Sequence, residues 1–397
     1  MKIIKIILRG AAAITGLFAL FLWTQNLWAT SKFSNLPDNN IVRVAVLSAV
    51  PQGEVSIRGI YQLVEPVSGK ILMEGRRLRA TWIKAGTDGI VLEGQSLHLR
   101  RVRFLTSMDV SITIKNNERR YRGAIDIIQD PKGTLTIVNR VDLEDYIKGV
   151  LYHEISHRWP MEVLKAQAVA SRSYAMYQMK ANAQRDFDVT SDIYSQVYGG
   201  KTGERYRTNL AVEYTHREIL VYQGKILPAY FHATCGGYTE DVQELWKNVN
   251  MAPLRGERCG FCLVSPHYWW QKNYRSKDIQ DKLNAAGYKI GLIKDISVVD
   301  RDRSGRIRLV QLTGRDGEKI TLPGKDFRQI IGPNDIRSNN YRIEMKGYYF
   351  DLVGKGWGHG VGLCQWGAYG MALQRYTCRE ILSQYYPGAQ IMDYRDL

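Results

Sequence analysis

Hydrophobic and polar residues alternate in short runs between residues 41 and 138, which is the period of β-strands. The clearest runs are Val42–Leu47, Leu97–Phe104 and Leu135–Val138. Turn residues such as Ser68-Gly69 and Asp130-Pro131 separate the runs, and helical periodicity is scarce. The pattern predicts a β-rich lobe over residues 41–138, a scaffold without a group of residues suited to catalysis.

The pattern changes to helical spacing after residue 138. Leu143, Ile147 and Val150 fall on one face, which predicts a helix with one buried side. Asp142 is placed to cap the start of this helix. Pro160 suits the first turn of another helix, so residues 139–180 are predicted to form two helices joined by a short break.

Glu154 occupies the next position of the buried stripe on the first helix. A carboxyl group there loses contact with water, which disfavours its charged form and raises its pKa. A Glu that stays protonated near neutral pH can serve as a general acid. The alternative is an ordinary charge at a helix end, since structural carboxylates outnumber catalytic ones.

The second helix is rich in Ala and Ser, which let neighbouring backbones approach closely, so we expect it near the centre of its domain. Four polar side chains lie among these small residues and are candidate substrate-binding groups: Lys165, Gln167, Arg172 and Tyr174. The alternative is that the cationic side chains are simply solvated.

Short strands and short helices follow residue 200. Turns at Gln223-Gly224, Ser304-Gly305 and Asp316-Gly317 predict hairpins. Helical segments are predicted at residues 276–286, 326–331, 364–374 and 377–385. The fold class is therefore α+β: the β-rich lobe at 41–138 precedes a domain of helices and hairpins around a cleft at 139–397.

The N-terminus has the features of an export signal. Lys2, Lys5 and Arg9 precede the apolar residues 10–23, as in a signal peptide or a short membrane anchor. Residues 1–30 are predicted to be this signal peptide or signal anchor, and residues 31–40 a polar linker. We expect the rest of the chain outside the cytoplasmic membrane, in the periplasm or cell wall, secreted or attached to the membrane through its N-terminus.

The 397 residues carry a formal net charge of +16. Such a charge attracts polyanions. The Lys and Arg residues are scattered without a nucleic-acid-binding motif, so no nucleic-acid partner is expected. Cell-wall glycan without its peptides exposes one carboxylate on each muramic acid, which suits a basic cleft. The alternative is that the charge serves solubility or attraction to an anionic membrane.

Five Cys residues in an exported chain leave at least one unpaired. His232 with Cys235, and Cys259 with Cys262, form two short pairs whose spacing is typical of a closed, structural zinc site. Zinc there would hold the intervening loop over the cleft. The alternative is a disulfide, Cys259–Cys262 or Cys235–Cys262, as is common outside the cytoplasm.

A glycine-rich run spans residues 354–362, between a predicted strand and a predicted helix. The glycine motifs of nucleotide-binding loops cannot be aligned with it. We predict that its backbone approaches substrate closely, with Trp357 as a sugar-stacking face and His359 and Gln365 as hydrogen-bonding groups. The alternative is a tight structural turn in which His359 is bonded locally.

Three blocks resemble the stage II sporulation protein D family, which contains peptidoglycan lytic transglycosylases and amidase-enhancer proteins. The blocks are residues 143–175, 191–200 and 356–368. The resemblance implies that Glu154 is the catalytic Glu, and Asp192 and Gln196 of the second block are candidate substrate-binding residues. It also favours zinc, since some members carry a Cys/His zinc site in the region of His232.

The expected function is that of an exported lytic transglycosylase, which cleaves the MurNAc–GlcNAc bond of peptide-stripped glycan strands. Two-carboxylate glycosidases need a second acidic residue, and no second Asp or Glu has a position comparable to that of Glu154. One Glu suffices when the muramic acid 6-hydroxyl attacks its own anomeric carbon. The alternatives are a hydrolytic muramidase and a non-catalytic, wall-binding enhancer of an N-acetylmuramoyl-L-alanine amidase, which would then be the partner.

Overall fold

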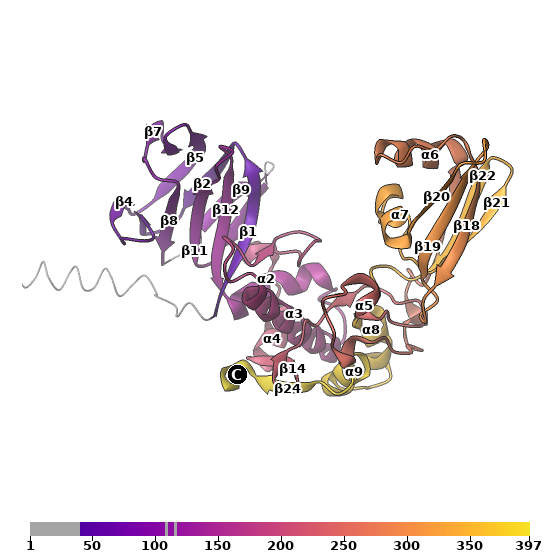
Figure 1. Ribbon diagram of the computed structural model, residues 1–397. Coiled ribbons are helices and arrows are strands. Elements are labelled where there is room, and N and C mark those ends of the chain that lie inside the picture. The colour runs from indigo at the N-terminus through magenta and orange to yellow at the C-terminus, as the bar shows by residue number, and fades with distance from the viewer. Residues whose placement is uncertain (1–39, 108–109, 115–116) are drawn as a thin grey trace, which may run out of the picture. The chain divides into compact units, whose positions relative to one another are not determined.

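The computed structural model describes residues 40–107, 110–114 and 117–397 (Figure 1). The predicted signal or anchor at residues 1–30, and all but the last residue of the predicted linker, lie outside the described residues. Within the described part, no helix is long and apolar enough to cross a membrane. The chain divides into two compact units, the first up to Gly149 with Asn182–Gly203, the second Val150–Ala181 with Glu204–Leu397.

The first unit is built on two sheets, with strand orders β13-β1-β12-β11-β8-β3-β4 and β10-β9-β2-β5-β6-β7. Strand pairing is antiparallel except between β1 and β13. The elements are β1 (Ile41–Val50), β2 (Gln52–Ile57), β3 (Tyr61–Val64), β4 (Ile71–Gly75), β5 (Leu78–Gly86), β6 (Gly89–Leu92), β7 (Gln95–Ser96), β8 (Arg101–Thr106), β9 (Val110–Ile114), β10 (Asn117–Tyr121), β11 (Ala124–Gln129), β12 (Leu135–Asp142), β13 (Val189–Thr190) and the 3₁₀ helix η2 (Gly200–Gly203). Alternate residues such as Val55, Ile57, Ile125 and Ile127 are buried, as the period-two pattern predicts.

The two helices predicted from residues 139–180 are present as α2 (Leu143–Glu154) and α3 (Met161–Ala181). The Asp142 carboxylate accepts the Glu144 N–H at 2.9 Å, which confirms the predicted cap. The stripe residues of α2, from Leu143 to Val150, have no exposed area. The division between the two units falls within α2, after Gly149, rather than at the predicted domain boundary before residue 139.

Helix α3 lies at the centre of the second unit, as its small residues predict. Residues 163–175 are buried except Lys165, and the helix contacts α4, β14, α8 and α9. The elements around it are α4 (Tyr206–Tyr214), β14 (Glu218–Tyr222), β15 (Lys225–Ile226), β16 (Phe231–His232), α5 (Val242–Leu245), η3 (Ala252–Leu254), η4 (Cys262–Val264), β23 (Leu363–Cys364), α8 (Gln365–Leu373), α9 (Cys378–Tyr385), β24 (Gln390–Asp393) and η5 (Tyr394–Asp396).

Residues 269–355 of the second unit have a hydrophobic core of their own, and we call them the insert lobe. Its elements are β17 (Trp269–Arg275), α6 (Ser276–Ala285), β18 (Ile293–Arg301), β19 (Ile307–Gly314), β20 (Lys319–Pro323), α7 (Gly324–Ile331), β21 (Tyr341–Lys346) and β22 (Tyr349–Lys355). Figure 1 shows them in orange, with two three-stranded sheets, β17-β22-β21 and β18-β19-β20. The predicted helices at 276–286 and 326–331 and both predicted hairpins of this lobe are present, so the protein as a whole is α+β.

The second unit buries the side chain of Arg172, and replacing this residue tests whether its guanidinium stabilises the fold. Arg172 has no exposed area, and its guanidinium donates to the Glu218 carbonyl at 2.8 Å and the Val212 carbonyl at 3.4 Å. Arg172→Gln would remove both bonds and leave the Glu218 carbonyl without this donor, so we expect the free energy of unfolding to fall by about 1–3 kcal/mol. Chemical denaturation measures this change.

The control variant for this test is Lys165→Gln on the same helix. The Lys165 side chain is 25% exposed and bonds to Glu162, so its replacement should change stability by less than about 0.5 kcal/mol. Equal stability of Arg172→Gln and the wild type would contradict a structural role for the buried guanidinium.

Candidate functional site

Glu154 is the last residue of α2, and its side chain is half-buried. The chain then turns through a tight loop, in which the Trp159 N–H donates to the Ser156 carbonyl at 3.0 Å. Helix α3 begins after Pro160, whose carbonyl accepts the Val163 N–H. A carboxyl group at the C-terminal end of a helix meets the negative end of the helix dipole, which favours its neutral form. This position suits an acid that gives up a proton.

The polar residues of α3 are bound mostly to protein groups. Gln167 donates to Ser171 at 3.1 Å and accepts from the Gln365 amide at 3.4 Å, and both Gln side chains are buried. Arg172 is bonded to backbone carbonyls as described above. The burial of Gln167, Arg172 and Gln365 favours a structural role over the predicted contact with substrate. The fold does bring Gln167 of the first block and Gln365 of the third together.

Of the other two predicted substrate residues of α3, Lys165 is partly exposed and Tyr174 is buried. Lys165 donates to the Glu162 carboxylate at 2.8 Å, and its ammonium group lies 5.4 Å from the centre of the Tyr214 ring. The Tyr174 ring packs edge-on against Tyr230, at 5.9 Å between ring centres. Of these residues, the partly exposed Lys165 is best placed to meet a ligand.

Asp192 and Gln196 belong to the first unit. The Asp192 carboxylate accepts the Thr190 hydroxyl at 2.8 Å and the Tyr194 N–H at 3.0 Å, which shapes an exposed turn. Gln196 is buried, and its side-chain oxygen accepts the Tyr146 hydroxyl at 3.1 Å. Asp192 is thus accessible to a ligand, whereas Gln196 ties the loop to α2.

The glycine-rich run packs against the protein's own backbone at residues 230–235. A Cβ atom on Gly356 would lie 2.6 Å from the Thr234 carbonyl oxygen, and one on Gly362 would lie 2.1 Å from that of Tyr230. Both glycines also have positive φ, of 83° and 69°. The run therefore approaches a neighbouring segment of the chain closely, and its approach to substrate stays a prediction.

His359 is satisfied within the protein, as the alternative interpretation held. Its Nδ1 accepts the Val361 N–H at 3.1 Å, and the Phe231 backbone hydrogen-bonds to the ring. Burial lowers the pKa of His359 to about 4, so the ring is neutral at neutral pH. This bonding favours a structural role over the predicted contact with substrate.

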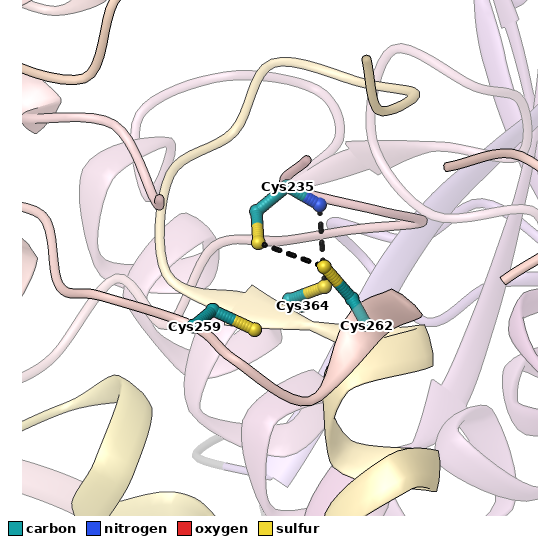
Figure 2. Close-up of side chains that lie close together, drawn as sticks. All are labelled: Cys235, Cys259, Cys262 and Cys364. Carbon is teal, nitrogen blue, oxygen red and sulfur yellow. Dashed lines mark hydrogen bonds between the residues drawn. The ribbon is translucent and has the colours of Figure 1, made fainter. Parts of the chain in front are cut away.

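Four buried thiols converge in the second unit: Cys235, Cys259, Cys262 and Cys364 (Figure 2). All four sulfur atoms lie within 4.8 Å of one another, and those of Cys235 and Cys262 are 3.5 Å apart. Tetrahedral coordination with 2.3 Å metal–sulfur bonds requires sulfur–sulfur distances of about 3.8 Å. All five Cys residues are described, and each is a free thiol, so neither disulfide considered from the sequence is present.

The surroundings of the four sulfur atoms suit thiolates bound to one cation. The Cys364 sulfur accepts the N–H groups of Cys235 at 3.2 Å and Gly367 at 3.3 Å. Burial raises the pKa of the Cys235 and Cys364 thiols, whereas hydrogen bonds from neighbouring thiols lower the pKa of Cys259. A divalent cation would compensate the charge of several buried thiolates at once, so this cluster could bind a metal.

The prediction of His232 as the fourth ligand is corrected to Cys364. The His232 ring is buried, and its Nδ1 lies 3.1 Å from the Val361 carbonyl oxygen. Strands β16 and β23 pair in parallel, with His232 opposite Cys364. This pairing places the Cys364 thiol in the cluster. The sequence signal was a fifth Cys directly after the glycine run, but the place of its thiol in the cluster depends on this long-range pairing.

A buried carboxyl group, Glu240, was missed by the sequence analysis. It accepts the Asp241 N–H at 2.8 Å and the Ser304 hydroxyl at 3.2 Å. The Arg306 guanidinium lies 3.9 Å away and donates to the Cys235 carbonyl, so these groups connect the insert lobe to the cysteine cluster. Burial, opposed by the charge of Arg306, raises the pKa of Glu240 to about 8.

Residues 131–222 match the family described as "Stage II sporulation protein", and residues 262–362 match a domain of unknown function. An uncharacterised protein of Brachyspira hyodysenteriae is 33% identical over 374 residues, which is 90% of this chain and 94% of that protein.

Named relatives come from Bacillus species. The stage II sporulation protein D of Bacillus amyloliquefaciens is 30% identical over 277 residues, covering 64% of this chain and 76% of that protein. The amidase enhancer of Bacillus subtilis is 26% identical over 357 residues, covering 78% of this chain and 49% of that protein.

Metal content of three variants tests whether Cys364 or His232 belongs to the metal site. Cys364→Ser should lose bound metal and unfold at a lower temperature, because a closed metal site contributes folding energy. His232→Asn should keep the metal, and Cys378→Ser is the control, since Cys378 is a buried thiol outside the cluster. Elemental analysis and thermal unfolding, with and without a chelator, measure these effects. Metal loss on His232→Asn and not on Cys364→Ser would reverse the assignment.

Glu240 predicts a pH dependence of stability. Because its folded pKa is about 8, above the ordinary value of 4.5, the folded state holds a proton that the unfolded state has lost between these values. As the pH rises from 4.5 to 8, the wild type should therefore lose stability relative to Glu240→Gln. The loss should be on the order of 5 kcal/mol at most. Denaturant titrations at several pH values, with Glu244→Gln as control, test this. A constant difference would show an ionised Glu240.

Proposed function

Because this chain belongs to the stage II sporulation protein D family, we propose that it is an exported peptidoglycan lytic transglycosylase with Glu154 as general acid and base. The observation that carries the proposal is the place of Glu154 at the end of a fully buried stripe on α2, half-buried beside the break that precedes α3. A half-buried carboxyl group is partly removed from water and still open to a substrate.

One carboxyl group can carry the whole reaction. Protonated Glu154 gives its proton to the glycosidic oxygen of the leaving GlcNAc as the bond to muramic acid C1 breaks. The resulting carboxylate takes the proton of the muramic acid 6-hydroxyl while that oxygen bonds to C1. The products are a 1,6-anhydro end and a free 4-hydroxyl, no water is consumed, and Glu154 ends protonated.

The charge of the chain supports the proposed substrate. Peptide-stripped glycan carries a carboxylate on each muramic acid, and the net charge of +16 favours binding to such a strand. Lys165, a partly exposed cation near the start of α3, is one candidate contact. The proposed substrate lies outside the cytoplasmic membrane, which agrees with the export signal predicted at residues 1–30.

The metal of the cysteine cluster is proposed to be zinc. Four thiolates in a closed tetrahedral arrangement are typical of structural zinc sites and leave no open position for catalysis. Cys235, Cys259, Cys262 and Cys364 would hold the ion. Its contribution would be to the fold, because it would join the loop before the insert lobe to the segment after it.

A second candidate function follows from the likeness to a protein named amidase enhancer, which extends over 78% of this chain. In that case the chain would bind the cell wall and increase the activity of an amidase without cleaving glycan. An assay of amidase activity on whole peptidoglycan, with Glu154→Gln added in place of the wild type, separates the two functions. An enhancer would act equally well with the Glu replaced.

The proposal is tested with Glu154→Gln on peptide-free glycan strands. Gln keeps the size of Glu and removes the transferable proton, so we expect a folded protein whose turnover falls by about 10²–10⁴-fold. Mass spectrometry of the products measures both rate and chemistry, because hydrolysis adds one water for each bond cleaved, at the new muramic acid end, and transglycosylation adds none.

The control is Glu344→Gln in the insert lobe, where Glu344 pairs with Arg342 at the surface. This variant should keep full turnover. Near-full activity of Glu154→Gln would show that another group supplies the proton, and products heavier by one water would favour the hydrolytic muramidase.

A further inference from the structure

Four half-buried aromatic rings follow one another across the second unit: Trp159, Trp366, His267 and Trp357. Their consecutive ring centres lie 5.0, 6.3 and 4.7 Å apart. We call these rings the aromatic strip. Trp159 lies in the break between α2 and α3, five positions after Glu154 in sequence, and Trp366 lies in the first turn of α8. His267 and Trp357 flank the insert lobe on its two sides in sequence.

The aromatic strip ends at a cation. The Arg337 guanidinium lies 4.9 Å from the centre of the Trp357 ring. Both residues are half-buried. Burial and then the charge of Arg337 lower the pKa of His267, so its ring is neutral at neutral pH and can share a hydrogen bond without adding charge. Consecutive rings meet edge to face, at interplanar angles of 67°, 80° and 85°, so ring faces and ring edges alternate along the strip, with the guanidinium over the last ring.

Such a combination is selective for one kind of ligand. Pyranose rings present a face of C–H groups that packs on indole, and their hydroxyls bond to ring nitrogens at the edge. A guanidinium beside the last ring pairs with a carboxylate. The residues of the strip are half-buried, whereas Phe327 and Phe350 in the core of the insert lobe have no exposed area.

We propose that the aromatic strip and Arg337 form a binding site for a carboxylate-bearing glycan strand, separate from the groups that transfer protons. The site rests on the proposed function, because its occupant is the strand that Glu154 would cleave. The strip would hold successive sugars from Trp159 towards Trp357, where Arg337 would pair with a muramic acid carboxylate.

The test measures binding in a Glu154→Gln background, in which the strand is not cut. Peptide-free muramic glycan and neutral chitin oligosaccharide are the two probes. Trp366→Ala should weaken binding of both probes by about tenfold or more, since central aromatic contacts dominate such interfaces. Arg337→Gln should weaken binding of muramic glycan by about tenfold and leave the neutral probe unchanged.

A matched control lies on the insert lobe. Trp269 is 60% exposed, and the Lys355 ammonium lies 4.7 Å from its ring centre, so this pair has the same chemistry as Trp357 with Arg337. Trp269→Ala and Lys355→Gln should leave both affinities unchanged. Equal losses for this pair and for the strip would mean that binding depends on general aromatic and positive surface, and would overturn the site.

Oxidative labelling tests the same site without a substitution that could disturb the fold. Muramic glycan should protect Trp357 and Trp366 from modification and leave Trp269 labelled as before. Glycan binding with unchanged labelling and unchanged affinity of Trp366→Ala and Arg337→Gln would overturn the strip and leave the proposed function intact. A Glu154→Gln protein that binds no glycan would overturn both.

Discussion

The second unit depends on the parallel pairing of residues 231–232 with residues 363–364. The pairing sets Cys235 beside Cys364, 129 positions apart. Closing a loop of that length costs about 4 kcal/mol of chain entropy, and the approach also requires glycines where a side chain would meet the carbonyls of Thr234 and Tyr230. Four thiols converge where the loop closes. Zinc bound by small domains contributes roughly 10–16 kcal/mol, so one ion would more than offset this cost and hold both ends of the insert lobe.

Two buried guanidinium groups also join segments of the second unit. The Arg306 guanidinium donates to the carbonyls of Cys235 and Tyr238, and the Arg172 guanidinium donates to those of Val212 and Glu218. In each case a cation from one segment satisfies backbone acceptors of another. Because an unpaired buried acceptor costs about 1–3 kcal/mol, such contacts tolerate few alternative arrangements. The interior is therefore positioned by hydrogen bonds as well as by apolar packing.

Local signals in the sequence were sufficient for the elements and insufficient for the site. The Asp142 cap, the Pro160 start and the stripe beginning at Leu143 each act within one or two turns, and α2 and α3 form as they predict. The choice between His232 and Cys364 as ligand depends on a register set by residues more than a hundred positions apart. The buried position of Arg172 also depends on distant residues, because its carbonyl partners lie at Val212 and Glu218. Polar residue types indicate chemistry, whereas burial decides whether a ligand can reach it.

The cysteine cluster and the aromatic strip share one short segment. The Cys364 sulfur accepts the Gly367 N–H and so caps the start of α8, and the Trp366 N–H donates to the Ala233 carbonyl at 3.0 Å. The backbone of Trp366 is thus held by Ala233, two positions from Cys235, and by the capped helix start at Cys364. An ion on the four sulfur atoms would hold this ring in place without touching a glycan. A structural metal with no open coordination position would then contribute to glycan binding indirectly, through the backbone that carries Trp366.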